Sequence, residues 1–282
     1  MTRALNWLKT RPTRARAFGI HLLVSLLVFS SLVAVMILYW FPGDLFFIDG
    51  GWQGLKLVAM VDLVLGPALT LILFKPGKPN LILDMSMVAA IQIAALGYGF
   101  YTTHQQRTVA IVYAERGFNT LSAQDNLEAD RVLLTLDAQP QPLPATTMLQ
   151  VPLLLTPIPE DGGFGKILED VLNGYPGPQE RSDQYVPLAA HHDAIRPDAL
   201  GLQQLADRGA LQVVERALKK RSLKPEEVEF YRFQARYARG IVILDPESMQ
   251  IVDFVPHEQQ ARLAAGKPSD EVRQSDKHIA EE

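Results

Sequence analysis

Three long apolar stretches in the first hundred residues constrain this chain more than any other feature. They run over about 17–41, 55–74 and 81–101. Each has about 20 residues or more, which is the length that an α-helix needs to cross a lipid bilayer. From about residue 105 onward the sequence is polar and mixed. The pattern therefore predicts a membrane α-helical anchor of three transmembrane helices, spanning 17–104, followed by one soluble domain.

The distribution of Lys and Arg predicts which side of the membrane the soluble domain faces. Residues 1–16 carry basic side chains and no acid, and the short loop at 75–79 carries Lys75 and Lys78. The loop at 42–54 has acidic side chains but no basic ones. Because Lys and Arg beside short loops stay on the cytoplasmic side, we expect the N-terminus and the 75–79 loop in the cytoplasm. Three crossings then place the soluble domain in the periplasm, with the anchor in the bacterial inner membrane.

Residues 105–256 have the mixed pattern of an α+β domain. The strand candidates are 108–113, 131–136, 148–155, 229–237, 240–244 and 250–255, and the helix candidates are 164–173 and the segment with Leu211, Val214 and Leu218. An Asp-Pro-Glu-Ser sequence at 245–248 suits a type I turn, so we expect the last two strands to pair. The charged end of the chain, 257–282, is thin in apolar residues and is expected to be disordered or helical.

Composition narrows the classes of function. The chain has a formal net charge of −4 and no cysteine. Its basic side chains are enriched before residue 105 and its acidic ones after it, so the soluble domain lacks the basic surface that nucleic acid requires. Without cysteine there are no disulfides, no thiol catalysis and no Cys-based metal site.

Polar side chains inside the apolar stretches are the candidates for a functional site, because a carboxylate in hydrocarbon is costly. The candidates for a partner-binding site are Asp62, Gln92, Ser30, Ser31, His21 and Asp84. At about 1.5 Å per residue, the first four lie near the middle of the membrane and the last two near its cytoplasmic edge. Two interpretations remain open. The groups hold the helices together, or they receive a polar or charged group from a partner helix. A proton or ion path is a third, less favoured reading.

A glycine and a proline follow Asp62 within two helical turns. Pro67 has no backbone N–H and so frees a carbonyl one turn back. The pair Gly66 and Pro67 therefore predicts a helix kink near the Asp62 carboxylate, unless it is a proline that the membrane helix simply tolerates.

Two enzyme-like features need an interpretation. Asp62 and Asp84 suggest a membrane-embedded aspartyl-type enzyme, but Asp84 lacks the Gly-x-Gly-Asp setting of such enzymes and three spans are few. The run His191-His192-Asp193 suggests a metal ligand set, but adjacent side chains rarely share a site and we expect an exposed loop. We therefore expect no catalytic residue, no metal and no cofactor. A periplasmic sensor or binding protein is the other alternative, and its cytoplasmic parts would be very short.

Several motifs together resemble a known family. They are His21-Leu-Leu, Tyr-Trp-Phe-Pro-Gly at 39–43, Asp-Leu-Val-Leu-Gly-Pro at 62–67, Leu-Thr-Leu at 69–71, Lys-Pro-Gly-Lys at 75–78, Asp84, Gln92 and Ala-Ala-Leu-Gly-Tyr-Gly at 94–99. Over about residues 14–104 this pattern resembles the type IV pilin accessory proteins of the TfpX/TfpZ group. The strand at 109–113 and the hairpin at 241–255 also resemble that family, whereas Gly117 interrupts its acidic-Arg-Phe run at 115–118.

The resemblance implies a non-enzymatic inner-membrane protein that modulates the stability, assembly or surface display of a type IV pilin. Its expected partners are the cognate major pilin, other inner-membrane proteins of the pilus machinery, and membrane lipids. A pilin waits in the membrane as one long helix with an N-terminal amine. That amine is a charged group that polar side chains of the anchor could meet.

Overall fold

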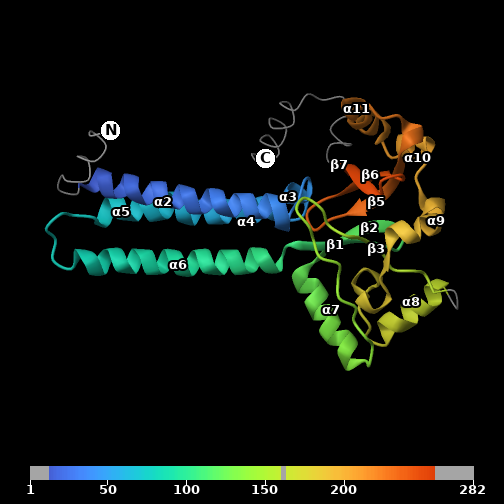
Figure 1. The fold of residues 1–282 in the computed structure, drawn as a ribbon, viewed down its shortest axis with the longest axis horizontal. Helices are drawn as coiled ribbons and strands as arrows, with labels where there is room; N and C mark the ends of the chain where they lie inside the picture. The colour runs from blue at the N-terminus through green and yellow to red at the C-terminus, as the bar shows by residue number, and fades with distance from the viewer. Residues whose placement is uncertain (1–12, 160–162, 258–282) are drawn as a thin grey trace, which may run out of the picture. The chain divides into compact units, whose positions relative to one another are not determined.

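The structure is a computed structural model, and it describes residues 13–159 and 163–257. The chain divides after Arg107 into two compact units (Figure 1). Unit 1 contains the apolar helices and unit 2 the mixed domain. The expectations for residues 1–12 and for the tail after residue 257 concern segments outside the described residues.

Unit 1 contains three helices that are long and apolar enough to cross a membrane, as the sequence predicts. The first is α2 (Arg14–Val35), which continues through a π-helical turn, Met36–Trp40. The second joins α4 (Gly51–Ala59), a π-helical turn at Met60–Leu65, and α5 (Gly66–Leu73). The third is α6 (Leu81–Gln105). A short helix, α3 (Leu45–Ile48), lies between the first two.

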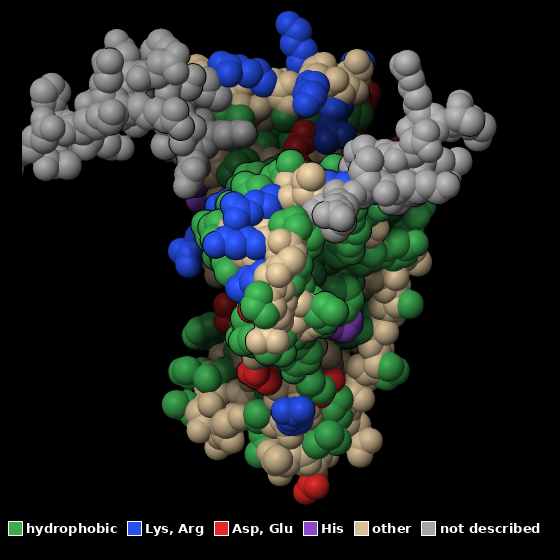
Figure 2. Space-filling view, turned by 90° about the vertical axis from the view of Figure 1, so that its left-hand side faces the viewer, with side chains coloured by type: hydrophobic (Ala, Val, Ile, Leu, Met, Phe, Trp, Pro, Cys, Tyr) green, Lys and Arg blue, Asp and Glu red, His purple; other side chains and the backbone are tan. Residues whose placement is uncertain are grey.

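Charged side chains separate to the two ends of unit 1. The end at which α2 and α6 begin carries Arg14, Arg16, Lys75 and Lys78 together with Asp84, and the other end carries Asp44 and Asp49 together with Lys56 and Arg107. Figure 2 faces the basic end and shows Lys and Arg side chains gathered there among hydrophobic ones. Along the helices most outward side chains are large and apolar, such as Leu27, Ile72 and Ile93. Such a surface suits a hydrocarbon environment.

Unit 2 is built on a mixed seven-stranded sheet, which confirms the expected α+β arrangement. The strands are β1 (Thr108–Ala114), β2 (Gly117–Ser122), β3 (Leu153–Leu155), β4 (Val186–Pro187), β5 (Glu229–Gln234), β6 (Arg239–Asp245) and β7 (Gln250–Pro256). Their order in the sheet is β4-β3-β1-β2-β5-β6-β7. The β1–β3 and β2–β5 pairs are parallel and the others antiparallel.

Five α-helices accompany the sheet in the described part of unit 2. They are α7 (Ala123–Thr135), α8 (Gly163–Leu172), α9 (His192–Ile195), α10 (Leu202–Asp207) and α11 (Leu211–Arg221). In Figure 1, α10 and α11 lie beside β5, β6 and β7. Leu205, Val214 and Leu218 from these helices share a buried core with Phe230 and Ile243 of the sheet. The apolar residues of α11 thus face this core, as their helical spacing predicts.

The strand predictions hold near the beginning and the end of the unit 2 sequence and fail between them. The strands predicted around 108–113, 240–244 and 250–255 are confirmed, as is the helix at 164–173. The strand predicted at 131–136 is wrong, because most of those residues belong to α7. Ser122 caps that helix by accepting a hydrogen bond from Asp125 N at 3.0 Å. Of the strand predicted at 148–155 only β3 forms, and β2 was not predicted.

Candidate functional site

Asp62 lies at the centre of a polar cluster that joins all three long helices of unit 1. It sits in the π-helical turn of the second helix and is 3% exposed. Ser25 of α2 donates its Oγ–H to Asp62 Oδ1 at 2.9 Å. Gln92 of α6 donates from Nε2 to the same oxygen at 3.4 Å. We call Asp62, Ser25 and Gln92 the three-helix polar cluster. Hydrogen bonds of this kind hold helices together where no water competes.

Gly66 makes room for one member of this cluster. It lies one turn beyond Asp62, and a Cβ atom built on it would meet Gln92 Nε2 at 1.8 Å. The Gln92 amide can therefore cross to Asp62 only over a residue without a side chain. Gly66 is thus required for close packing of the second helix against α6.

The backbone just before Pro67 departs from regular α-helical geometry. The residue cannot donate the hydrogen bond that an α-helix would place on the carbonyl one turn back. In the structure the backbone before it widens into the π-helical turn, and Gly66 N donates to Val61 O, five residues back. Such single turns often mark functional positions in helices. Here the turn contains Asp62 itself.

One oxygen of Asp62 is left without a partner. Asp62 Oδ2 forms no hydrogen bond within the described residues, although that atom is buried. Leaving a buried acceptor unsatisfied costs about 1–3 kcal/mol, and native structures rarely retain such groups without a reason. Oδ2 therefore retains an unused acceptor position, which an outside donor reaches only if the side chains covering it move aside.

His21 and Asp84, the candidates nearer the basic end, have separate partners. His21 Nδ1 lies 2.6 Å from Thr70 Oγ1. This contact joins α2 to α5, and His21 lies about one helical turn from Ser25. Asp84 forms an ion pair with Lys78 of the preceding loop. The first contact reinforces the packing of the first two helices, and the second attaches the start of α6 to its loop.

The structure places Ser30 and Ser31 away from the cluster. Both are exposed on α2, and Ser31 Oγ donates back to Leu27 O at 2.9 Å. The serine that reaches Asp62 is Ser25, which the sequence analysis did not single out. Ser25 lies more than one helical turn before Ser30 and Ser31, so the depth estimate differs from the structure. The seven-residue spacing of Ser25 and the buried Leu32 marks the buried face of α2.

In unit 2, His192 differs from its expected place in an exposed loop. It opens α9, its side chain is 12% exposed, and its Nε2 lies 2.6 Å from Glu229 Oε2. Tyr231 donates its hydroxyl to the same oxygen at 2.7 Å. Burial alone would raise the pKa of Glu229, but the hydrogen bonds from Tyr231 and His192 lower it overall. His191 is exposed, as expected.

The Glu229 carboxylate is surrounded by side-chain partners. Among residues 13–159 and 163–257, no group of three or more His, Asp or Glu side chains could hold a metal ion. The Glu229 oxygens contact the Tyr231 hydroxyl, the His192 ring and Arg196, whose Nε lies 3.4 Å away.

Three fimbrial assembly proteins of Dichelobacter nodosus are similar in sequence to this chain. The protein of serogroups C1 and C2 is 35% identical over 115 residues, which are 40% of this chain and 88% of that protein. The proteins of serogroups E1 and I are 34% and 35% identical over 132 residues, which are 46% of this chain and 48% of each relative. The chain therefore spans about half the length of these two relatives. No family model and no solved structure matches the chain.

Proposed function

Because the chain belongs to the family of fimbrial assembly proteins, we propose that it is a non-enzymatic accessory factor of type IV pilus assembly that contacts the pilin within the membrane. The family and the three apolar helices support a membrane protein with a role in pilus assembly. The proposal adds a partner, the cognate major pilin, and a place of contact, the three-helix polar cluster.

The single observation that carries the contact is the free oxygen of Asp62. The cluster satisfies Oδ1 twice and leaves Oδ2 without a donor among the described residues. If the cluster only joined the helices, a neutral side chain would serve equally well. A carboxylate with one unpaired oxygen suits a cationic donor such as the N-terminal amine of a pilin helix, which would have to displace the side chains that cover Oδ2.

The positions of the charged residues support an orientation. The basic end of unit 1, with Arg14, Arg16, Lys75 and Lys78, would face the cytoplasm. Unit 2 begins directly after the third span and would lie in the periplasm, so that the protein is a multi-pass protein of the inner membrane. One chain could then contact both the membrane helix and the periplasmic part of a pilin.

The two intramembrane aspartates favour this function over catalysis. A pair of catalytic aspartates shares one site and one proton. Asp62 bonds to Ser25 and Gln92, whereas Asp84 is paired with Lys78. Each carboxylate therefore has its own local partners.

Co-purification tests the proposal. The full chain, tagged and extracted from membranes in detergent together with the cognate major pilin, should retain that pilin with an unaltered mass. A chain truncated after residue 107 should retain it more weakly, because the contact in the membrane survives and any contact through unit 2 is lost. Absence of pilin from the full-length sample would contradict the proposal. A pilin whose mass depends on this protein would show that the protein is an enzyme.

A further inference from the structure

Helix α8 exposes the side that an amphipathic helix normally buries. Its apolar residues recur at the spacing of one helix face, which in globular proteins packs on the core. Yet none of its residues is buried. Phe164 is 70% exposed and Leu172 is 78% exposed, and Leu168 and Val171 between them are also exposed.

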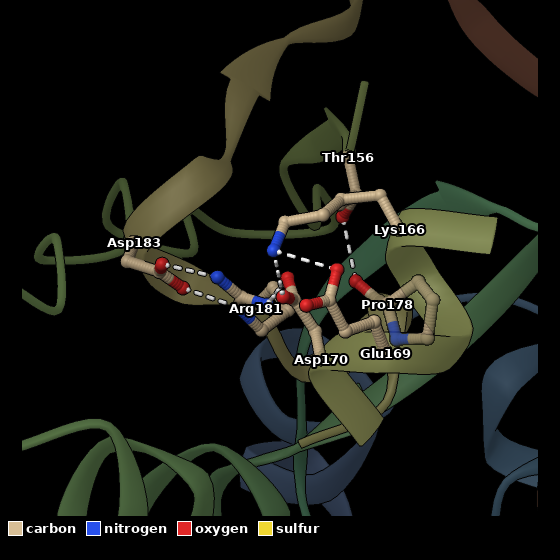
Figure 3. A network of polar contacts seen from close by, with 7 residues as sticks. All are labelled: Thr156, Lys166, Glu169, Asp170, Pro178, Arg181 and Asp183. Atoms are coloured by element: carbon tan, nitrogen blue, oxygen red, sulfur yellow. Dashed lines mark hydrogen bonds and ion pairs between the residues drawn. The ribbon is translucent and has the colours of Figure 1, made fainter. Parts of the chain in front are cut away.

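Ion pairs of Asp170 hold α8 in place (Figure 3). Arg181, only 7% exposed, donates from Nη1 to Asp170 of α8 at 2.9 Å. It also donates to both oxygens of Asp183 at 2.9 Å, and Lys166 lies 3.1 Å from Asp170. The guanidinium lies 4.5 Å from the centre of the Tyr175 ring. The helix is thus fixed through Asp170, while Leu168 and Leu172 stay exposed.

A groove of about 620 Å³ lies along α8, and its lining includes the ion pair of Asp170 and Arg181. Phe164, Ile167 and Val171 of α8 form one wall and Ile158 contributes to the other. The groove is also lined by Pro157, Pro159, Pro176 and Pro178. Because proline has a fixed φ, these walls lose little conformational entropy when a ligand binds, which favours affinity.

The groove has a basic end made by Arg116 and Arg232. Arg232 donates from Nε and Nη2 to the Arg116 carbonyl at 3.2 and 2.9 Å, and no ion pair joins it to a carboxylate of the described residues. Arg116 lies 3.7 Å from Asp198, with a side chain that is 69% exposed. Both guanidinium groups retain donors for an anion, and Glu115 is the acidic neighbour at this end.

The backbone at this end is held in an uncommon conformation. Glu115 and Arg116 form the two-residue turn between β1 and β2, with φ of 51° and 64°. Asn-Gly or Asp-Gly normally occupies such a turn, because both residues need positive φ. Strained residues of this kind cluster at binding sites. Here the turn presents the Arg116 carbonyl to Arg232 and places both guanidinium groups at the groove.

We infer that this groove binds an apolar segment of the pilin that carries a carboxylate at one end. The inference rests on the proposed function and assigns the partner a second contact, on unit 2. The apolar walls would bury the side chains of the segment, and Arg116 and Arg232 would receive its carboxylate. A lipid surface fits less well, because a plane does not fill a groove.

Site-specific photo-cross-linking in membranes tests this contact. The full chain, co-produced with the cognate major pilin, would carry a benzophenone side chain at Phe164 or Val171 in the groove. The matched control position is Leu134 of α7, which is 61% exposed and lies outside the groove. We expect pilin adducts from both groove positions and none from Leu134.

Other outcomes separate this inference from the proposed function. Co-purification of pilin without adducts from either groove position would overturn the groove contact and leave the proposed function standing. Adducts with lipid or with a second copy of this chain would also overturn it, because the groove would then have another occupant. Loss of co-purification altogether would contradict both.

The charge of Arg232 gives a second test. Arg232→Gln keeps a donor for the Arg116 carbonyl and removes the cation, so adduct yield from Val171 should fall about tenfold, the effect of losing one charge-assisted hydrogen bond. Arg131→Gln, on the exposed surface of α7, is the matched control and should leave the yield unchanged. Equal yields from both variants at equal protein level would show that no carboxylate binds there.

Discussion

A Cβ atom on Gly66 would lie 1.8 Å from Gln92 Nε2, so the second helix and α6 pack at a distance that only glycine permits. The amide that passes over Gly66 ends on Asp62. The absence of a side chain at Gly66 thus allows Gln92 of α6 to reach Asp62 of the second helix. The three-helix polar cluster depends on this packing as much as on its own three side chains.

Gly66→Ala should therefore destabilise unit 1. The new methyl group would displace the Gln92 amide from Asp62 and leave that buried amide unpaired, at a cost of about 1–3 kcal/mol, whereas Asp62 keeps its bond from Ser25. The measurement is the thermal stability of the full chain in detergent. Gly97→Ala is the matched control, because no atom lies within 4 Å of a Cβ at Gly97 of α6. Equal stability of the two variants would contradict the packing argument.

Much of unit 1 follows from sequence because the membrane imposes simple rules. A span needs length and apolar side chains, and both are visible without a structure. The identity of the polar partners is less visible. Asp62 and Gln92, which the sequence places near one depth, meet in the structure. Ser25 escapes prediction because it lies more than one helical turn from Ser30 and Ser31, the positions that the depth estimate matches to Asp62, and because depth does not give the helical face.

Unit 2 shows where periodicity is ambiguous. The short apolar run Val132-Leu133-Leu134 suits either a strand or one turn of a helix. Only the cap at Ser122, ten residues earlier, indicates the helix. Strand β2 was missed because its turn, Glu115 and Arg116, lacks the glycine or asparagine that normally announces a hairpin. The hairpin of β6 and β7 was found because its turn has the expected residues.

The contact of His192 with Glu229 predicts a difference between two adjacent histidines. His192→Ala removes a 2.6 Å contact at a largely buried carboxylate and should destabilise unit 2 by about 1–3 kcal/mol. His191→Ala should have little effect, because that side chain is exposed. Protease resistance of the full chain in membranes, measured for both variants, checks this. Equal resistance would show that the contact contributes nothing.

Glu229 also predicts a dependence on pH. Its pKa is lowered in the folded protein, so the folded state binds fewer protons than the unfolded state near that pKa. The stabilisation by Glu229 is therefore complete above the ordinary glutamate pKa of about 4.3 and is lost as the pH falls through the lowered value. Relative to Glu229→Gln, the wild-type advantage in thermal stability should shrink on acidification. An advantage that grows at low pH would contradict this sign.

The arrangement of charges in unit 1 predicts a topology. A reporter that is active only in the periplasm should be active when fused after about residue 110 or at the C-terminus. The same reporter should be silent in the loop at 75–79, beside Lys75 and Lys78. The reverse pattern would place unit 2 in the cytoplasm, where it has no access to the periplasmic part of a pilin.

The Asp62→Asn variant tests the central claim most directly, through surface piliation measured together with the membrane level of the protein. An amide of similar size can still accept from Ser25, so a cluster that only joins helices would function normally. Asn cannot offer a charged oxygen to a cationic partner. We therefore predict that surface piliation falls while the membrane level of the variant stays normal, and that Ser31→Ala, away from the cluster, changes neither. Normal piliation in Asp62→Asn would contradict a charged contact with the pilin.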